Sequence, residues 1–386
     1  TAMTHPSASK NAFIPTWMSV LSDVLFQKLR CKHLPKTSLE MVTFPHGKEE
    51  KSSSKKTFKK QTIIVTGPTS GIGETTALTL AMRGHRVILA CRTVSKGETM
   101  VKKWQQKYSS KNTRLKLDCV VMKLDLNSLR SIREFAKTFT DVEDRLDVLI
   151  NNAGVFDMSN KYVLTEDAYE QHHGTNFLAP SLLSLLLIGK MLETKTTEGC
   201  ETAARQSNSR IVFVSSKLHE FAKNYDMQKK SFGFSAKKAY ANSKMAEIAF
   251  AKVLERKVCK AFYTNAKDGR DPSNAPIKMM SLHPGNIITN VVKTLPKLIQ
   301  FLYRTTMRQI LFTCDEGARA TVYCAQSEYA FEEAKGKFGS YFDSACELRE
   351  PNSLSEIEEE GLWREVLKEF GMSEAQLIKE WQTALA

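Results

Sequence analysis

From residue 61 onward the chain repeats one pattern, in which short apolar runs alternate with longer stretches of helical periodicity. Six of these runs are rich in β-branched or other apolar residues, and they lie at residues 62–67, 86–92, 116–126, 146–154, 210–216 and 277–285. Strands that are apolar on both faces and alternate with helices form parallel sheets covered on both sides. The pattern therefore predicts an α/β protein built on a doubly wound parallel sheet.

Two amphipathic stretches lie outside this repeat. Residues 12–30 and residues 361–381 each place apolar side chains at helical spacing. The first of these helices either lies on a membrane surface or packs on the α/β part, and the sequence leaves both interpretations open. We expect three parts in the chain: a basic extension and linker at 1–60, the α/β domain at 61–346 and an acidic helical tail at 347–386.

Charge is unevenly distributed along the 386 residues, whose formal net charge is +14. Residues 1–60 carry 11 Lys and Arg against 4 Asp and Glu, whereas residues 347–386 carry 4 against 10. No basic segment interleaved with aromatic residues and no nucleic-acid-binding motif accompanies this charge, so we expect no nucleic-acid partner.

The eight cysteines form no CxxC pair and no cluster with histidine. Their spacing argues against a metal site and against a disulfide framework, and it favours an intracellular reducing compartment. The apolar run at 177–192 is shorter than the roughly 18 residues that cross a bilayer, and it contains Pro180 and Lys190. We expect a buried helix there.

The first apolar run leads directly into a glycine-rich segment, TGPTSGIG, at residues 66–73. Such a turn between a first strand and a helix binds a pyrophosphate, because the helix N-terminus offers N–H groups and a positive dipole end. Where an NAD site usually carries an acid, the second run ends with Arg92, followed by Lys96, so the sequence favours NADP(H) over NAD(H). The expected contacts at the turn are Gly67, Thr69, Ser70, Gly71, Ile72 and Gly73.

Tyr240 and Lys244 lie four residues apart in YANSK and would project from one face of a helix. A nearby ammonium favours the phenolate, which makes the tyrosine a usable acid or base near neutral pH. Ser216, which ends the fifth run, would hydrogen-bond the substrate oxygen. A second pair, Tyr225 and Lys229, lies in a polar stretch with no apolar helix behind it, so we assign the acid to Tyr240.

Seven motifs occur in order, namely TGPTSGIG, LDL at 124–126, NNAG at 151–154, TN at 175–176, VSS at 214–216, YANSK and HPG at 283–285. Together they resemble the short-chain dehydrogenase/reductases over roughly residues 60–345. ACR, HPG followed by NIITN, and GARATVYCA are similar to the branch of the retinol dehydrogenases, the WW-domain oxidoreductases and the plant Forever-Young proteins. The resemblance implies a Rossmann-type fold with helices on both faces of the sheet.

The resemblance also implies roles for individual residues. Asn176 would maintain a water relay to Lys244, and Ser216 would polarise the substrate carbonyl. Tyr240 would donate the proton, and Lys244 would also bind the nicotinamide ribose. The other cofactor-binding positions that it implies are Asp125 at the adenine edge, followed by Leu126, then Asn152, Ala153 and Gly154, and finally Pro284, Gly285 and Thr289 near the nicotinamide amide.

In the same family, the region corresponding to residues 289–312 covers the substrate. Here it combines apolar and basic side chains, which suits a lipophilic alcohol or carbonyl of the retinoid, steroid or long-chain aldehyde type taken from a membrane surface. Packing over the core or against a second subunit explains the same composition. The family pairs subunits through two long helices, here around 182–192 and 240–254, which implies a homodimer.

Two functions remain open at this point. One is an NADP(H)-dependent oxidoreductase that acts on such a lipophilic substrate. The other is a catalytically silent subunit, structural or regulatory, of a larger membrane-bound assembly. The intact set of Asn176, Ser216, Tyr240 and Lys244 favours the enzyme. The basic extension suggests the peripheral membrane of an organelle, either the mitochondrion, the plastid or the ER.

Overall fold

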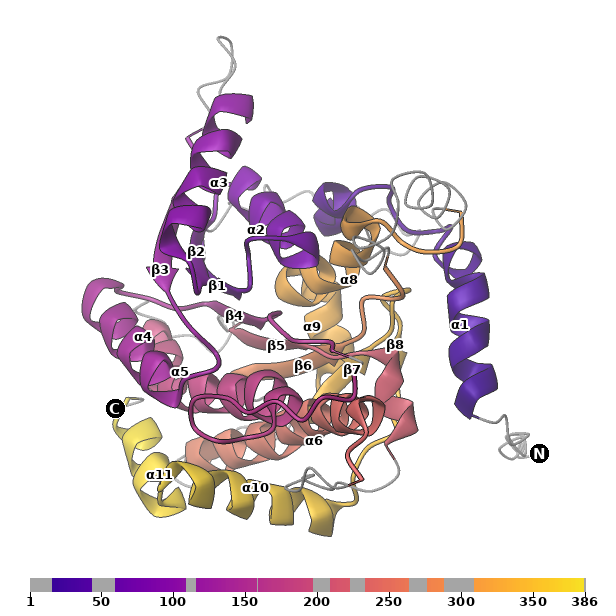
Figure 1. Cartoon of the computed structure of the whole chain (residues 1–386). Coiled ribbons are helices and arrows are strands. Elements are labelled where there is room, and N and C mark those ends of the chain that lie inside the picture. Colours follow the sequence, from indigo (N-terminus) through magenta and orange to yellow (C-terminus); the bar gives the residue numbers. More distant parts are fainter. Residues whose placement is uncertain are drawn as a thin grey trace, which may run out of the picture.

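The computed structural model describes residues 16–43, 60–108, 116–157, 159–196, 209–222, 233–263, 276–287 and 309–384 (Figure 1). Its strands are β1 (Thr62–Thr66), β2 (Arg86–Cys91), β3 (Cys119–Lys123), β4 (Val148–Asn151), β5 (Arg210–Val214), β6 (Lys278–Leu282), β7 (Ser340–Phe342) and β8 (Leu348–Arg349). Its α-helices are α1 (Thr16–Arg30), α2 (Gly71–Met82), α3 (Val94–Tyr108), α4 (Leu129–Val142), α5 (Ala179–Thr196), α6 (Ala236–Tyr263), α8 (Cys314–Gln326), α9 (Glu328–Ala334), α10 (Glu356–Phe370) and α11 (Glu374–Thr383). Shorter helical segments are η1 (Ser38–Thr43), η2 (His173–Leu178) and η3 (Lys217–Phe221).

The described strands form a single sheet in the order β3-β2-β1-β4-β5-β6-β7-β8. All neighbours pair in parallel except β8, which runs antiparallel to β7. The chain builds outward from β1 to β3 and then crosses to β4 on the other side of β1. Ligands of doubly wound sheets bind at this switch point, outside the carboxyl ends of the strands. The predicted Rossmann-type fold is confirmed.

Helices cover both faces of the sheet (Figure 1). One face packs against α4, α5 and α6, where Ile64 and Ile88 belong to the core. The other packs against α2, α3, α8 and α9, where Ile63 and Val87 belong to the core. Neighbouring residues of one strand thus serve opposite cores, because side chains alternate across a strand.

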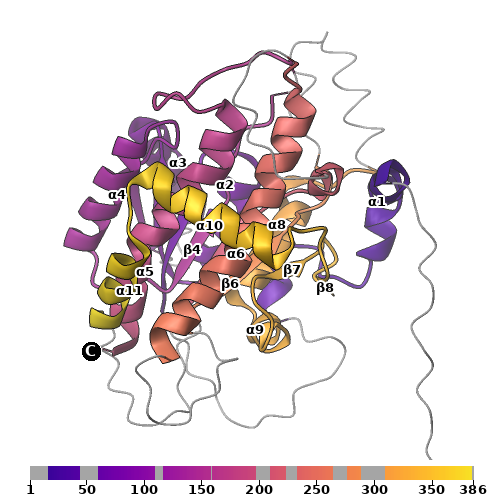
Figure 2. The ribbon, with the colours of Figure 1, turned by 90° about the horizontal axis from the view of Figure 1, so that it is seen from below.

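The acidic tail forms a further layer over α5 and α6 (Figure 2). Trp363 and Trp381 of α10 and α11 are buried in the same core as α6, and the Trp363 ring stacks on Phe250 with centroids 6.1 Å apart. Carboxylates of the acidic tail pair with basic residues of α6. For example, Arg256 Nη2 lies 2.7 Å from a carboxylate oxygen of Glu359. Basic residues of α6 and acidic residues of the tail therefore meet at this contact. The tail covers part of α5 and α6, the helices through which the family resemblance implies pairing of subunits.

Within the described residues, one stretch, His173–Thr194, is long and apolar enough to cross a membrane by length and composition alone. It includes α5, and 83% of its apolar window is buried inside the protein. The packing of this stretch against α4, α6 and α11 accounts for its apolar composition.

The N-terminal arm packs on the α/β domain through its polar side. Asp23 and Gln27 of α1 are buried, whereas six large apolar side chains of the same helix are exposed. Beyond α1, the Ser38 hydroxyl donates to Asp315 Oδ1 at 2.7 Å and Arg319 donates to the Pro35 carbonyl at 3.0 Å. The exposed apolar side chains are Trp17, Met18, Leu21, Leu25, Phe26 and Leu29.

Candidate active site

The glycine-rich turn between β1 and α2 lies against the segment that follows β4. A Cβ on Gly73 would come within 2.3 Å of the Gly67 oxygen, and a Cβ on Gly67 within 2.9 Å of the Ala153 Cβ. Gly67 and Gly71 both have a φ of +63°, a conformation that favours glycine. At Gly71 a Cβ would meet nothing within 4 Å. The turn is therefore closed towards the protein and open at Gly71, as a phosphate cradle requires.

The start of α2 offers donors to this open space. Ser70 is the N-cap residue, but its side chain makes no capping hydrogen bond to the first turn. N–H groups at an uncapped helix N-terminus are the usual ligands of a phosphate. Behind the turn, the Asn152 amide donates to the Thr66 oxygen at 2.9 Å, and the Ala153 N–H donates to Thr66 Oγ1 at 3.0 Å. These contacts fit a dinucleotide with its phosphates at the turn.

Positive charge lies at the end of β2. Arg92 is exposed and makes no hydrogen bond or ion pair within the described ranges. A cavity of about 620 Å³ between α2 and α3 is lined in part by Thr69, Glu74 and Lys96. Arg92 and Lys96 would suit a 2′-phosphate, whereas Glu74 adds one negative charge nearby.

The predicted adenine-binding residues follow β3. Asp125 Oδ1 accepts from the Asn127 N–H at 3.0 Å, and the Asp125 N–H donates to Ser131 Oγ at 3.0 Å. Leu126 packs against the core formed with α4. The carboxylate is thus oriented by its own loop.

Tyr240, the predicted proton donor, lies near the start of α6. Its ring makes edge contacts with Phe156 at 4.7 Å and with His172 at 5.9 Å between centroids. His172 is fixed in turn, because its Nδ1 lies 2.8 Å from Glu170 Oε1 and its Nε2 accepts from the Asp157 N–H at 3.2 Å. These contacts hold the Tyr240 ring from two sides and give His172 a supporting role.

A chain of hydrogen bonds joins Asn176 to the tyrosine backbone. Asn176 lies in η2, a π-helical segment at the start of α5, and is fully buried. Its Nδ2 donates to Ser243 Oγ at 3.2 Å, and the Ser243 hydroxyl donates to the Tyr240 carbonyl at 2.8 Å. π-helical turns are frequent at functional sites. The segment places Asn176 beside Gly154, where a Cβ would lie 3.2 Å from Asn176 Oδ1.

Lys244 lies between Gly154, a predicted cofactor-binding residue, and the end of β5, the strand that Ser216 follows. Its Nζ donates to the Val214 carbonyl at 3.0 Å, and a Cβ on Gly154 would lie 3.4 Å from the same Nζ. The Ser215 hydroxyl donates to the Lys244 carbonyl at 2.8 Å. Ser216 follows as the N-cap of η3, where its Oγ accepts from the Leu218 N–H at 3.2 Å and keeps its own proton for another acceptor.

The ammonium of Lys244 also has a carboxylate partner that the sequence reasoning missed. Glu247, one turn further along α6, lies 3.1 Å from Lys244 Nζ, and both side chains are buried. Burial raises the pKa of Glu247 to about 7, although the ammonium opposes this shift. The sequence carried a signal for this pair, because Glu247 is an acid three residues after Lys244 in an otherwise apolar stretch.

The remaining predicted site residues lie on the segment after β6 or outside the described residues. Pro284 and Gly285 follow β6 at the same edge of the sheet, and Gly285 has a φ of +81°. Thr289 lies outside the described residues, as do the competing pair Tyr225 and Lys229 and most of the predicted cover at 289–312.

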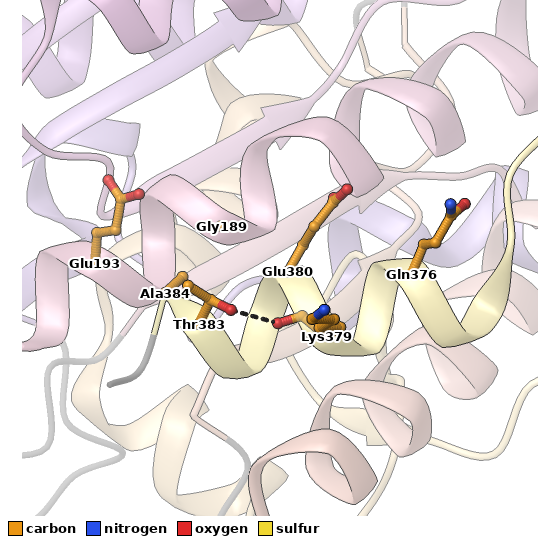
Figure 3. Close-up of a pocket in the computed structure, with 7 residues that line it drawn as sticks. All are labelled: Gly189, Glu193, Gln376, Lys379, Glu380, Thr383 and Ala384. Atoms are coloured by element: carbon orange, nitrogen blue, oxygen red, sulfur yellow. Dashed lines mark hydrogen bonds between the residues drawn. The ribbon is translucent and has the colours of Figure 1, made fainter.

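A shallow cavity of about 670 Å³ lies between α5 and α11 (Figure 3). It is lined at the C-terminal half of α5, by Gly189 and Glu193, whereas Asn176 precedes the N-terminal end of that helix. On α11 the Thr383 hydroxyl donates to the Lys379 carbonyl at 2.9 Å. None of the predicted site residues lines this cavity.

Comparisons with known proteins agree with the motifs. Residues 61–297 match the family described as short chain dehydrogenase. The chain is 33% identical over 313 residues to the Arabidopsis thaliana protein described as dehydrogenase/reductase SDR family member FEY, which covers 80% of this chain and 72% of the relative. It is 31% identical over 320 residues to human retinol dehydrogenase 14, covering 78% and 84%. A solved structure of a protein from Mycobacterium paratuberculosis matches with a TM-score of 0.57 and 27% identity, covering 82% and 95%.

The buried Glu247 predicts a pH-dependent stability. Its pKa is about 7 in the folded protein and 4.5 in its unperturbed state, so between these values the unfolded chain releases the proton while the folded chain retains it. The free energy of unfolding then falls as pH rises, by up to about 1.4 kcal/mol per pH unit. Glu247→Gln removes this slope between pH 5 and 7, as urea unfolding at several pH values would show. The exposed Glu350→Gln is the control, and parallel curves for wild type and Glu247→Gln would contradict the assignment.

Proposed function

The chain belongs to the short-chain dehydrogenase family, a family of nicotinamide-dependent oxidoreductases, and we propose that it transfers a hydride between NADP(H) and a lipophilic alcohol or carbonyl. One observation carries the proposal. A Cβ on Gly154 of the predicted cofactor segment would lie within 3.4 Å of both Asn176 Oδ1 and Lys244 Nζ, and Asn176 is linked through Ser243 to the Tyr240 carbonyl. The cofactor cradle and the predicted catalytic residues therefore form one connected site.

The chain's own side chains then provide the proton chemistry. When bound, the nicotinamide supplies or accepts the hydride. In the direction of reduction, Ser216 donates a hydrogen bond to the substrate oxygen, and Tyr240 transfers its phenolic proton to the same oxygen. The rings of Phe156 and His172 restrict the motion of Tyr240 and so keep the phenol oriented.

A lipophilic substrate is supported by the relatives. One of these relatives, human retinol dehydrogenase 14, is named after a lipophilic alcohol, retinol. The alternative, a catalytically silent subunit, has one observation in its favour, because Glu247 lies 3.1 Å from Lys244 Nζ and offsets its positive charge whenever the carboxyl group is ionised. A purified chain that binds NADPH but turns over no retinoid, steroid or long-chain aldehyde would support that alternative.

The outward face of α1 supports contact with a lipid surface. Trp17 and Leu29, near the two ends of the helix, are 59% and 55% exposed, and the turn after the helix adds the exposed Lys32 and Lys36. An apolar helix face flanked by basic residues suits the boundary between anionic headgroups and acyl chains. We therefore propose a peripheral membrane position for this chain, on an organelle.

Replacing the acid should stop turnover and spare cofactor binding. Tyr240→Phe removes only the hydroxyl, so we expect the rate to fall by about 10² to 10⁴ while the Kd for NADPH stays within twofold. Stopped-flow absorbance of NADPH and nicotinamide fluorescence measure the two quantities. The exposed Tyr329→Phe should behave as wild type, and undiminished turnover by Tyr240→Phe would remove Tyr240 from the reaction.

Replacing the arginine at the end of β2 should change the cofactor preference. Arg92→Ala loses a charge-assisted contact to the 2′-phosphate, so the Kd for NADPH should rise about tenfold or more while the Kd for NADH is unchanged. Arg130→Ala, at an exposed ion pair on α4, is the matched control. Equal effects on both nucleotides would contradict a role for Arg92 in reading the phosphate.

Charges on the outward face of α1 should release the protein from lipid. The double variant Leu21→Glu with Leu25→Glu should lose flotation with vesicles of phosphatidylcholine and phosphatidylserine, because ionised carboxylates do not enter the acyl region. Ile357→Glu, at an exposed site on α10, should float as wild type does. If wild type does not float, or if the double variant still does, this face is not the membrane contact.

A further inference from the structure

The segment after β6 is tied to a distant part of the chain. Ile287 forms a parallel bridge with Phe312, and the Phe312 N–H donates to the Asn286 carbonyl at 2.9 Å. A Cβ on Gly285 would come within 2.6 Å of the Phe312 ring. The described residues on either side of 288–308 thus lie next to each other.

Gln27 of α1 joins these two segments through its side-chain amide. Its Nε2 donates to the Asn286 carbonyl and to the Ile310 carbonyl, both at 2.9 Å. Its Oε1 accepts from the Asn286 N–H at 2.7 Å. The amide therefore takes the place of a peptide unit between two backbone segments, and the side chain is fully buried.

Asp23, one turn earlier on α1, extends the contact. Its Oδ2 accepts from Asn286 Nδ2 at 3.1 Å, and its other oxygen pairs with Arg30. Asp23 is also buried. Polar residues on the inward side of a helix are costly unless each finds a partner, and here both Gln27 and Asp23 hydrogen-bond Asn286 of the loop after β6.

We propose that Gln27 is a positioning residue that holds Pro284–Ile287 in place against the nicotinamide end of the cofactor. The inference rests on the proposed function, in which Pro284 and Gly285 line that end. Because Gln27 satisfies both backbone groups of Asn286, its loss leaves the loop two hydrogen bonds short and lets it move. The glycine turn and Arg92 belong to elements that Gln27 does not contact, so the adenosine end keeps its ligands.

Two ligands separate this role from a purely structural one. Gln27→Met keeps the length of the side chain and removes its hydrogen bonds. We expect the Kd for NADP⁺ to rise about three- to tenfold, while the Kd for 2′,5′-ADP, which lacks the nicotinamide half, stays within twofold. Calorimetry on the full chain measures both, with Leu25→Met on the outward face of α1 as the control.

Hydrogen exchange reports on the loop without any ligand. In Gln27→Met the amides of 285–287 and 310–313 should exchange at least tenfold faster, while those of β1 and α2 stay protected. Unchanged exchange and unchanged NADP⁺ affinity would overturn the proposal, as would an equal loss of affinity for both ligands. If the wild-type protein binds neither NADP⁺ nor 2′,5′-ADP, the proposed function itself fails. A failure confined to the role of Gln27 leaves wild-type binding of both ligands intact.

Discussion

The close approach of two backbone segments, the turn after β1 and the residues after β4, is the constraint on which the site depends. It leaves no room for a side chain at Gly67, where a Cβ would lie 2.9 Å from the Ala153 Cβ, or at Gly73, where a Cβ would lie 2.4 Å from Asn152 Nδ2. The same contact orients Asn152 and Ala153 through Thr66. Gly154 then follows within reach of Asn176 and Lys244. This steric requirement therefore helps to set the distance between the predicted cofactor cradle and the predicted catalytic residues Asn176 and Lys244.

Much of this arrangement could be predicted from the sequence. The six apolar runs contain β1 to β6, because buried parallel strands need apolar residues on both faces. β7 and β8, of 3 and 2 residues, were missed, since so short a segment carries no periodicity. The glycine turn, Ser216, Tyr240 and Lys244 were predicted from the chemistry of their motifs. The other site residues were predicted from the resemblance, and the structure places most of the predicted residues at one edge of the sheet.

The partners of those residues were missed for different reasons. Glu247 lies three residues after Lys244 on α6, a spacing that the sequence shows, whereas the contact of Ser243 with Asn176 joins residues 67 positions apart and depends on the folded structure. The sequence left the orientation of α1 open, because periodicity identifies an apolar stripe without saying whether it faces the protein or a lipid surface. Here the inward side carries Asp23 and Gln27, which share a partner, Asn286, more than 250 residues away in the sequence.

The acidic tail covers α5 and α6, the two helices through which the family resemblance implies pairing of subunits. Because α10 and α11 are attached to the body, their local concentration at α5 and α6 does not change when the protein is diluted. An interface supplied by a second chain would dissociate at low abundance, whereas this one persists at any copy number. The fold can therefore keep its core sealed in a cell that makes very little of the protein.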